Sequence, residues 1–154
     1  MLTQINGDIT KIKSDNLKII CHQCNCVGSM GAGLALTLKK EFPKCYDDYM
    51  EAYITSKLKL GNVIISDIKK NNTIILHICG QYHYKGKKPL TNYNALTTAF
   101  NEIKEYLNIL KTKNIEYNIY FPYKFGCGLA GGNWNTVYTL IEQILPETII
   151  VKFN

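Results

Sequence analysis

Two glycine-rich segments carry the residues of this chain best suited to hold a charged ligand. The first spans residues 28–33 and the second spans residues 126–132, and each runs into a helical pattern. A glycine loop that opens a helix leaves amide N–H groups without partners at the positive end of the helix dipole, which favours an anion there. Two such loops in 154 residues indicate two clamps on one multiply charged ligand.

Other phosphate-binding motifs do not fit these loops. Neither segment is followed by the Gly-Lys-Ser/Thr of a P-loop. The spacing of Gly28, Gly31 and Gly33 lacks the short first gap of the dinucleotide fingerprint, and no acidic ribose contact comes after it, so a redox Rossmann enzyme is disfavoured. The alternative for each loop alone is a tight turn in which glycine supplies a positive φ.

Strand and helix patterns alternate along the chain and position these loops. Strands are expected over residues 2–6, 17–22, 62–68, 73–79, 117–122 and 147–153, and helices over 33–42, 44–55, 92–111 and 134–145. This alternation predicts one domain over residues 1–154, a three-layer α/β/α fold with a mixed, largely parallel sheet. Each glycine loop comes after a strand, so both should lie at the carboxyl edge of the sheet, where ligands bind.

Composition limits the partners only weakly. The formal net charge is +6, from 18 basic and 12 acidic residues, which is compatible with an anionic ligand or nucleic acid. No groove-reading helix or RNA motif is visible, and no apolar run reaches membrane-spanning length. We therefore expect a cytoplasmic monomer without a membrane partner. Reduced cysteines are expected in that location, and no second ligand pair completes Cys21-x-x-Cys24 as a metal site.

Three motifs resemble those of macrodomains, which bind ADP-ribose. Asn6-Gly7-Asp8-Ile9-Thr10 resembles the Gly-Asp-Ile-Thr opening of that family, and residues 25–35 and 121–134 resemble its two ligand loops. The resemblance covers the whole chain and implies a sheet of six or seven strands. Within the family it is similar to the branch of terminal ADP-ribose protein glycohydrolase and of bacterial and phage proteins that process ADP-ribose-1″-phosphate. It implies ADP-ribose as the ligand, with no cofactor.

The resemblance also implies which residues bind. Asp8 matches the carboxylate that accepts a hydrogen bond from the adenine amino group, and Ile9 matches a neighbour that frames the adenine. Asn25 matches a polar residue beside the distal ribose. The alternatives are an aspartate of a turn or helix N-cap and an asparagine of a turn. The other positions implied to contact the ribose and the diphosphate are Gly31, Ala32, Gly33, Lys124, Phe125, Gly126, Cys127, Gly128, Leu129 and Ala130.

Two residues between the loops are candidates for catalysis. Glycohydrolases of the resembled branch use an attacking lysine together with an aspartate of the second loop, and Ala130 stands in place of that aspartate. Lys85 is the best positional match for the lysine, and Lys87 and Lys88 are neighbouring cations. His83 can serve as a general base near neutral pH. The alternatives are a solvated basic loop and a water oriented by the diphosphate itself.

The expected function is therefore hydrolysis of an ADP-ribose derivative. The substrate is ADP-ribose attached to a protein, a nucleic acid or a small molecule, or it is ADP-ribose-1″-phosphate. The alternative is a reader module that binds ADP-ribose without turnover, a role which the loss of the acid at position 130 favours. Nucleic-acid binding is a third class and rests only on the basic balance and the many tyrosines.

Overall fold

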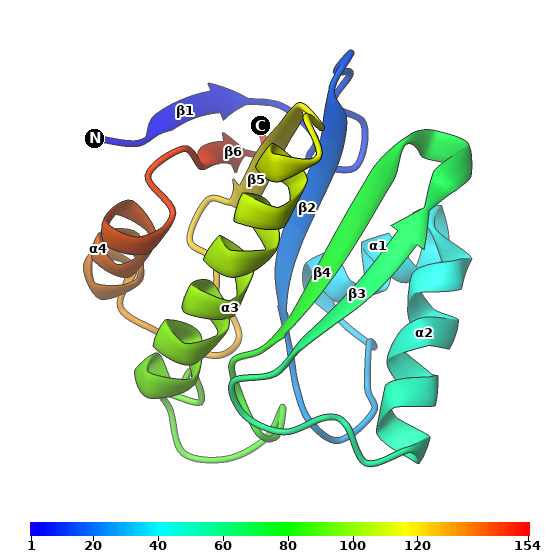
Figure 1. Ribbon diagram of the computed structural model, residues 1–154. Helices are drawn as coiled ribbons and strands as arrows, with labels where there is room; N and C mark the ends of the chain where they lie inside the picture. Colours follow the sequence, from blue (N-terminus) through cyan, green and yellow to red (C-terminus); the bar gives the residue numbers. More distant parts are fainter.

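Six strands form one mixed sheet in the computed structural model, which describes residues 1–154 (Figure 1). They are β1 (Thr3–Asn6), β2 (Leu17–Cys24), β3 (Val63–Ile68), β4 (Thr73–Cys79), β5 (Tyr117–Pro122) and β6 (Ile149–Lys152). Their order across the sheet is β1-β6-β5-β2-β4-β3. Only β3 runs antiparallel to its neighbour, β4. The predicted mixed and largely parallel sheet is confirmed.

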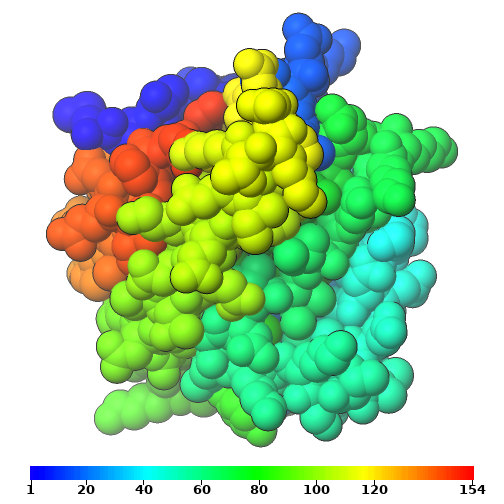
Figure 2. Space-filling model, in the orientation of Figure 1, coloured from blue at the N-terminus to red at the C-terminus, as the bar shows by residue number.

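Helices cover both faces of this sheet. They are α1 (Gly33–Glu41), α2 (Pro43–Ile54), α3 (Tyr93–Thr112) and α4 (Trp134–Ile144), with a short 3-10 turn η1 (Lys69–Asn71) before β4. Figure 1 shows α1 and α2 on one face, and α3 and α4 on the other. In the same orientation, Figure 2 shows the yellow-green α3 beside the orange and red C-terminal part of the chain, with the green β3–β4 region visible on the right. Three layers are therefore confirmed. None of the helices has the length and apolar character needed to cross a membrane.

Local sequence explains why these elements form. All seven residues of β4 are buried, as expected for a strand covered on both faces. In α3, the buried residues recur at helical spacing and form one apolar stripe: Ala95, Leu96, Ala99, Phe100, Ile103, Leu107 and Leu110. The Asn92 side chain accepts a hydrogen bond from the Ala95 amide and caps α3. Pro43 separates α1 from α2 because proline fits the first turn of a helix.

The cysteines divide between the two faces of the sheet. Cys21 packs in the core beneath α3 and α4, whereas Cys24 and Cys26 pack in the core beneath α1 and α2. Residues three apart in a strand point to opposite faces, so Cys21 and Cys24 cannot bind one metal ion. All six cysteines are free thiols, and the Sγ atoms of Cys24 and Cys79 lie 3.7 Å apart. The three cysteines around the end of β2 are small buried side chains of the core.

Parallel pairing brings five chain segments to one edge of the sheet. β1, β6, β5, β2 and β4 all run in the same direction, so the segment after each of these strands emerges at the same carboxyl edge. The first loop (residues 25–32) comes after β2, and the second loop (residues 123–133) comes after the neighbouring β5. The predicted shared edge of the two glycine loops is confirmed. Residues 80–92, which we call the lysine loop, leave β4 at this edge as well.

Candidate functional site

The first loop presents a helix N-terminus that the protein leaves open. Ala32 occupies the N-cap position of α1 and makes no side-chain capping hydrogen bond. The amides of Gly31, Ala32 and Gly33 donate to no acceptor within the protein. Gly33 has a φ of +56°, and a Cβ built there would meet no atom within 4 Å. An anion can therefore approach these amides at the positive end of the α1 dipole.

The second loop is open through its own amides as well as through the first amides of α4, those of Trp134 and Asn135. Asn133 caps α4 by accepting a hydrogen bond from the Thr136 amide, in contrast to the uncapped α1. Three consecutive amides, of Gly128, Leu129 and Ala130, donate to no acceptor within the protein. The two loops thus differ in the Asn133 cap of α4 and in the free amides that the second loop adds ahead of its helix. The sequence indicated a loop that opens a helix in both cases, and α1 and α4 do begin directly after the two loops.

A cavity of about 430 Å³ lies on one side of the α1 N-terminus. Its lining comes from all three resembled motifs and from the C-terminal strand: Gly7, Asp8, Ile9, Leu34, Thr37, Pro122, Tyr123, Val151, Lys152 and Phe153. We call it the proximal cavity. It brings together Asp8 and Ile9, which the sequence assigned to adenine, with the first turns of α1.

Asp8 is both a turn residue and an available acceptor. Its Oδ1 accepts hydrogen bonds from the Thr10 amide at 2.9 Å and from the Thr10 hydroxyl at 2.7 Å. The Thr10 hydroxyl is the main cause that lowers the pKa of the Asp8 carboxyl. Oδ2 makes no hydrogen bond within the protein. An ionised carboxylate therefore keeps one oxygen free at the proximal cavity, and the predicted contact with adenine stays a prediction.

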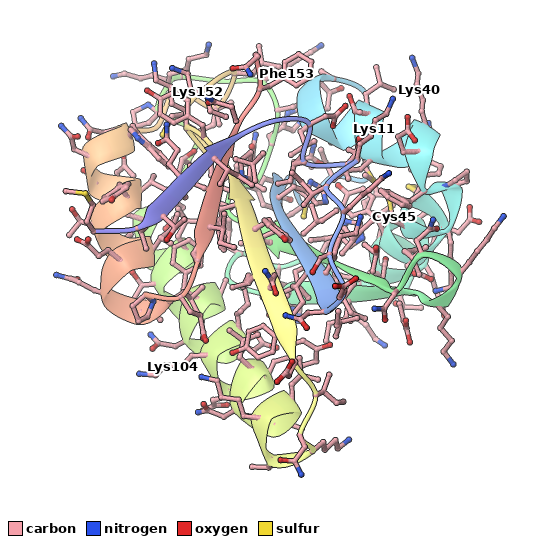
Figure 3. The ribbon with its side chains drawn as sticks, turned by 90° about the horizontal axis from the view of Figure 1, so that it is seen from above. Lys11, Lys40, Cys45, Lys104, Lys152 and Phe153 are labelled. Atoms are coloured by element: carbon pink, nitrogen blue, oxygen red, sulfur yellow. The ribbon has the colours of Figure 1, made fainter.

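Phe153 belongs to this cavity and was missed from the sequence. Its side chain is 75% exposed although it lines the proximal cavity. Figure 3 shows Lys152 and Phe153 at the end of β6, on the side of the molecule where α1 lies. An exposed aromatic ring beside a free carboxylate oxygen suits a planar base, which needs both a stacking face and a polar partner. The predicted last strand extended to residue 153 and so included this aromatic, whereas β6 ends at Lys152.

A second cavity of about 440 Å³ lies on the other side of the α1 N-terminus. We call it the distal cavity, and its lining residues are Gln23, Cys24, Asn25, Ser29, Gly31, Ala32, Ala35, Gln81, Tyr84, Lys88 and Leu129. Lys88 is the only basic side chain among them, and no carboxylate or imidazole is present. The distal cavity therefore has a positive charge balance.

Asn25 shapes the first loop from within. Its Oδ1 accepts from the Tyr49 hydroxyl at 2.8 Å and from the Val27 amide at 3.1 Å, and its Nδ2 donates to the Ser29 carbonyl at 2.8 Å. The residue is 7% exposed. These bonds are those of the turn asparagine that was the alternative assignment. One amide hydrogen has no acceptor in the protein, and the expected contact with the distal ribose stays a prediction.

The lysine loop brings Lys88, rather than Lys85, to the distal cavity. A Cβ at Gly131 would lie 3.1 Å from Lys88 Cδ, so the lysine stem runs along the second loop. Lys85 is exposed and lines neither cavity. The Nδ1 atom of His83 accepts the Lys85 amide at 2.9 Å, and His83 lines neither cavity. Neither Lys85 nor His83 therefore lies at a cavity, and the catalytic roles assigned to them stay predictions.

The remaining predicted positions of the second loop contribute mainly backbone. Phe125 is 2% exposed and packs against Phe100 and Phe121 in the core, so its side chain cannot reach a ligand. The Cys127 thiol donates to the Phe125 carbonyl, and burial raises the pKa of that thiol. Lys124 is exposed, with a φ of +59°. The carbonyl of Gly126 accepts the Thr91 hydroxyl at 2.5 Å and so faces the lysine loop.

Comparison with known proteins agrees with this architecture. The Macro domain family model matches residues 21–141. An uncharacterized 17.5 kDa protein from the tk-vs intergenic region of Enterobacteria phage T4 is 30% identical over 148 residues, 96% of this chain and 92% of that protein. A solved structure of a protein of unknown function from Bacteroides thetaiotaomicron superposes with a TM-score of 0.86 at 25% identity, covering 100% of this chain and 98% of that one.

Two relatives with named activities are similar over nearly the whole chain. ADP-ribose 1″-phosphate phosphatase of Saccharomyces cerevisiae is 28% identical over 165 residues, covering 92% of each protein. DNA ADP-ribosyl glycohydrolase of Mycobacterium tuberculosis is 30% identical over 158 residues, 99% of this chain but 42% of that protein. The family model and these matches establish that this chain belongs to the macrodomain family.

Proposed function

We propose that this protein binds ADP-ribose and hydrolyses the terminal phosphate of ADP-ribose-1″-phosphate. The proximal and distal cavities, of about 430 and 440 Å³, flank the N-terminus of α1. In this proposal the adenosine occupies the proximal cavity and the ribose phosphate occupies the distal one. The diphosphate crosses between them, over the open amides of Gly31–Gly33 and Gly128–Ala130.

At the proximal end, the free Oδ2 of Asp8 accepts a hydrogen bond from the adenine amino group. A guanine has a carbonyl at the corresponding position, so a carboxylate there selects adenine. Phe153 supplies a stacking face for the base. Ile9 is 7% exposed and lines the same cavity, which suits its assigned role of framing the adenine.

The charge of the distal cavity is the observation that carries the choice of reaction. A phosphate monoester brings about two negative charges at neutral pH. Lys88 is a cation in this cavity without a carboxylate beside it, and the free second-loop amides add hydrogen-bond donors. Water attacks phosphorus, the bond between phosphorus and the 1″ oxygen breaks, and the products are ADP-ribose and inorganic phosphate. Lys88 and the amides stabilise the negative charge of the phosphoryl group during transfer.

Removal of ADP-ribose from an adduct is the second candidate. The glycohydrolase relative supports it, and so does the exposed Tyr84 at the distal cavity, which can contact an attached group. Glycohydrolases of the resembled branch pair an attacking lysine with an aspartate of the second loop, but Ala130 stands in place of that aspartate and the distal cavity contains no carboxylate. The phosphatase reaction needs no such pair, so the residues present favour it. A reader module without turnover is the remaining alternative.

A substrate panel separates the three functions. Purified protein is incubated with ADP-ribose-1″-phosphate, with ADP-ribosylated protein and with ADP-ribosylated DNA, and the products are resolved by anion-exchange chromatography. We expect ADP-ribose and phosphate from the first substrate only. ADP-ribose released from either adduct, with the monoester intact, would identify a glycohydrolase. Calorimetric binding of ADP-ribose with no product from any substrate would identify a reader.

We further propose that the protein acts as a cytoplasmic monomer. The six unpaired cysteines, five of them buried, support a reducing compartment. Both cavities are lined by residues of a single chain, so the proposed site needs no second copy. Light scattering coupled to size-exclusion chromatography should give the mass of one chain, 17.5 kDa. A dimer mass at micromolar concentration would contradict this.

A further inference from the structure

The side chain of Gln23 lies where three parts of the proposed site meet. It is the penultimate residue of β2, and it lines the distal cavity. Its Nε2 donates to Gln81 Oε1 and to Thr91 Oγ1, each at 2.9 Å. Gln81 and Thr91 lie near the two ends of the lysine loop, and Lys88 lies between them in the sequence. One carboxamide therefore holds both ends of this loop.

The same network continues into the second loop. The Thr91 hydroxyl donates to the Gly126 carbonyl at 2.5 Å, and the Gly132 amide donates to that carbonyl at 3.0 Å. The Leu90 amide donates to the Ala130 carbonyl at 2.7 Å. The lysine loop and the second loop are consequently joined, and Gln23 is the side chain on the sheet that anchors both.

The orientation of the carboxamide is set by its partners. The Thr91 hydroxyl gives its hydrogen to Gly126, so it offers Gln23 only a lone pair. The Gln81 amide donates to the His83 carbonyl, so its oxygen faces Gln23. Nε2 must therefore point at both, which leaves Oε1 buried without a partner. The unsatisfied oxygen costs free energy that offsets part of what the two donated bonds contribute, so the distinctive effect of glutamine here is the pair of directed bonds to Gln81 and Thr91.

Glycine makes room for this carboxamide on both sides. A Cβ at Gly126 would lie 2.8 Å from Gln23 Oε1, and a Cβ at Gly80 would lie closer still. Gly126 also has a φ of +70°. Larger residues at positions 80 and 126 would displace Gln23. Gly126, which was assigned to the ligand, therefore also leaves the space that the Gln23 side chain occupies.

We propose that Gln23 is a positioning residue for the distal phosphate. It holds Lys88 and the free amides of the second loop at the mutual spacing that the transferred phosphoryl group requires, and it does so through Thr91 and Gln81. This inference rests on the proposed function. Its physical reason is that preorganised donors act only when held within a few tenths of an ångström of the developing charge.

Hydrogen exchange tests the anchoring without any ligand. The variant Gln23→Met removes both donated bonds at nearly constant volume. The matched control is Asn16→Leu, which removes the 2.8 Å amide bond to Asn118 beside the opposite end of β2. We expect the Leu90 and Gly132 amides to exchange at least about tenfold faster in Gln23→Met and to be unchanged in Asn16→Leu. Unchanged exchange of both amides in Gln23→Met would overturn the proposal.

Ligand binding then separates positioning from a general loss of structure. AMP occupies only the proximal cavity, so its affinity should stay within about twofold in Gln23→Met. ADP-ribose affinity should fall about tenfold, because the second-loop amides no longer hold their spacing. Equal losses for AMP and ADP-ribose would mean that Gln23 is merely structural, and no loss for either would also contradict the role.

Kinetics with ADP-ribose-1″-phosphate complete the test. Thr91→Val should lower kcat about tenfold or more with a smaller change in KM, while Thr91→Ser, which keeps the hydroxyl, should restore most of kcat. If Thr91→Ser is as impaired as Thr91→Val, the Thr91 hydroxyl does not connect Gln23 to the second loop in the way we propose. If the wild-type protein itself releases no phosphate, the proposed function fails, whereas exchange and ADP-ribose binding still decide the role of Gln23.

Discussion

At the scale of single residues, the site separates three tasks among different side chains. Asp8 offers an acceptor at the proximal cavity, Lys88 offers a charge at the distal one, and Gln23 holds the segment that carries this charge. Each task depends on a distinct physical property: a free lone pair, an uncompensated cation and a directed hydrogen bond. Each can therefore be removed separately.

Replacing Lys88 should affect phosphate transfer more than replacing Lys85. Lys88 lines the distal cavity and Lys85 does not. Losing a charge-assisted hydrogen bond costs about 1.5–3 kcal/mol, so Lys88→Ala should lower kcat/KM for ADP-ribose-1″-phosphate by about 10–100-fold. Lys85→Ala should change it by less than about threefold, which steady-state phosphate release will measure. The reverse ranking would restore Lys85 as the catalytic lysine.

Replacing Asp8 should weaken the choice of base. Asp8→Asn turns an acceptor-only carboxylate into an amide that can present N–H to the base. We expect ADP-ribose to bind about tenfold more weakly and the inosine analogue, with a carbonyl in place of the amino group, to bind no more weakly than before. Calorimetry with both nucleotides measures the ratio. An unchanged ratio would show that Oδ2 does not contact the base.

At the scale of elements, the open N-terminus of α1 is the feature that accepts the diphosphate. Gly33→Ala places a methyl group on a residue with a φ of +56°, next to the unpaired amides. Positive φ costs an L-residue about 1–2 kcal/mol, so the free energy of unfolding should fall by about that amount. ADP-ribose affinity should also fall, by about tenfold or more, because the methyl group occupies the anion's approach.

Gly61→Ala is the control for that variant. Gly61 has a φ of +91° and precedes β3, and it lines neither cavity. Its replacement should reduce the free energy of unfolding by more than Gly33→Ala does, because a Cβ there would also lie 3.2 Å from Thr98 Cγ2, and it should leave ADP-ribose affinity unchanged. Chemical denaturation and calorimetry on both variants give the comparison. If Gly33→Ala binds as the wild type does, α1 does not receive the diphosphate.

The elements were largely predictable, and the loops between them were not. Strand β4 was predicted at Thr73–Cys79 and is found there, because a short unbroken run of β-branched and apolar residues is typical of a buried strand. Helix α3 was predicted from its periodic stripe and differs by one residue at each end. Lys88, Phe153 and Gln23 were not predicted as site residues. Their placement depends on the path of the lysine loop and on the strand order across the sheet, which no local periodicity encodes.

At the scale of the whole molecule, a buried histidine pair joins the neighbouring strands β2 and β4. His22 Nε2 and His77 Nδ1 are 2.7 Å apart, and His77 Nε2 lies 2.9 Å from the Ser66 hydroxyl. Both rings are at most 1% exposed. Burial lowers the pKa of His22 to about 4, and burial together with repulsion from His22 puts the pKa of His77 well below its ordinary value. Both rings are therefore neutral in the folded protein at pH 7.

This pair makes stability depend on acidity. The unfolded chain binds protons at His22 and His77 near pH 6.5, whereas the folded chain resists them, so stability rises with pH in this range. The contribution is fully present above pH 6.5 and is lost as pH falls towards about 4, with His22 alone accounting for about 3 kcal/mol. Urea denaturation at pH 7, 5.5 and 4.5 should show the decline.

The variant His22→Gln provides the matching control, because glutamine offers His77 a polar partner and does not ionise in this range. Its stability at pH 7 is expected to be lower, but its loss between pH 6.5 and 4.5 should be smaller than that of the wild type. A wild-type stability that stays flat over this interval would show that the pair is not buried and neutral in solution.

The central claim is that one molecule of ADP-ribose-1″-phosphate spans both cavities with its monoester beside Lys88. Phosphorus NMR of that substrate with the protein tracks the monoester and the diphosphate as separate signals. We predict that the monoester signal is replaced by inorganic phosphate while the diphosphate signals remain, and that Lys88→Ala slows this by about 10–100-fold. A monoester signal that persists with equimolar wild-type protein, while the diphosphate signals report binding, would contradict the account.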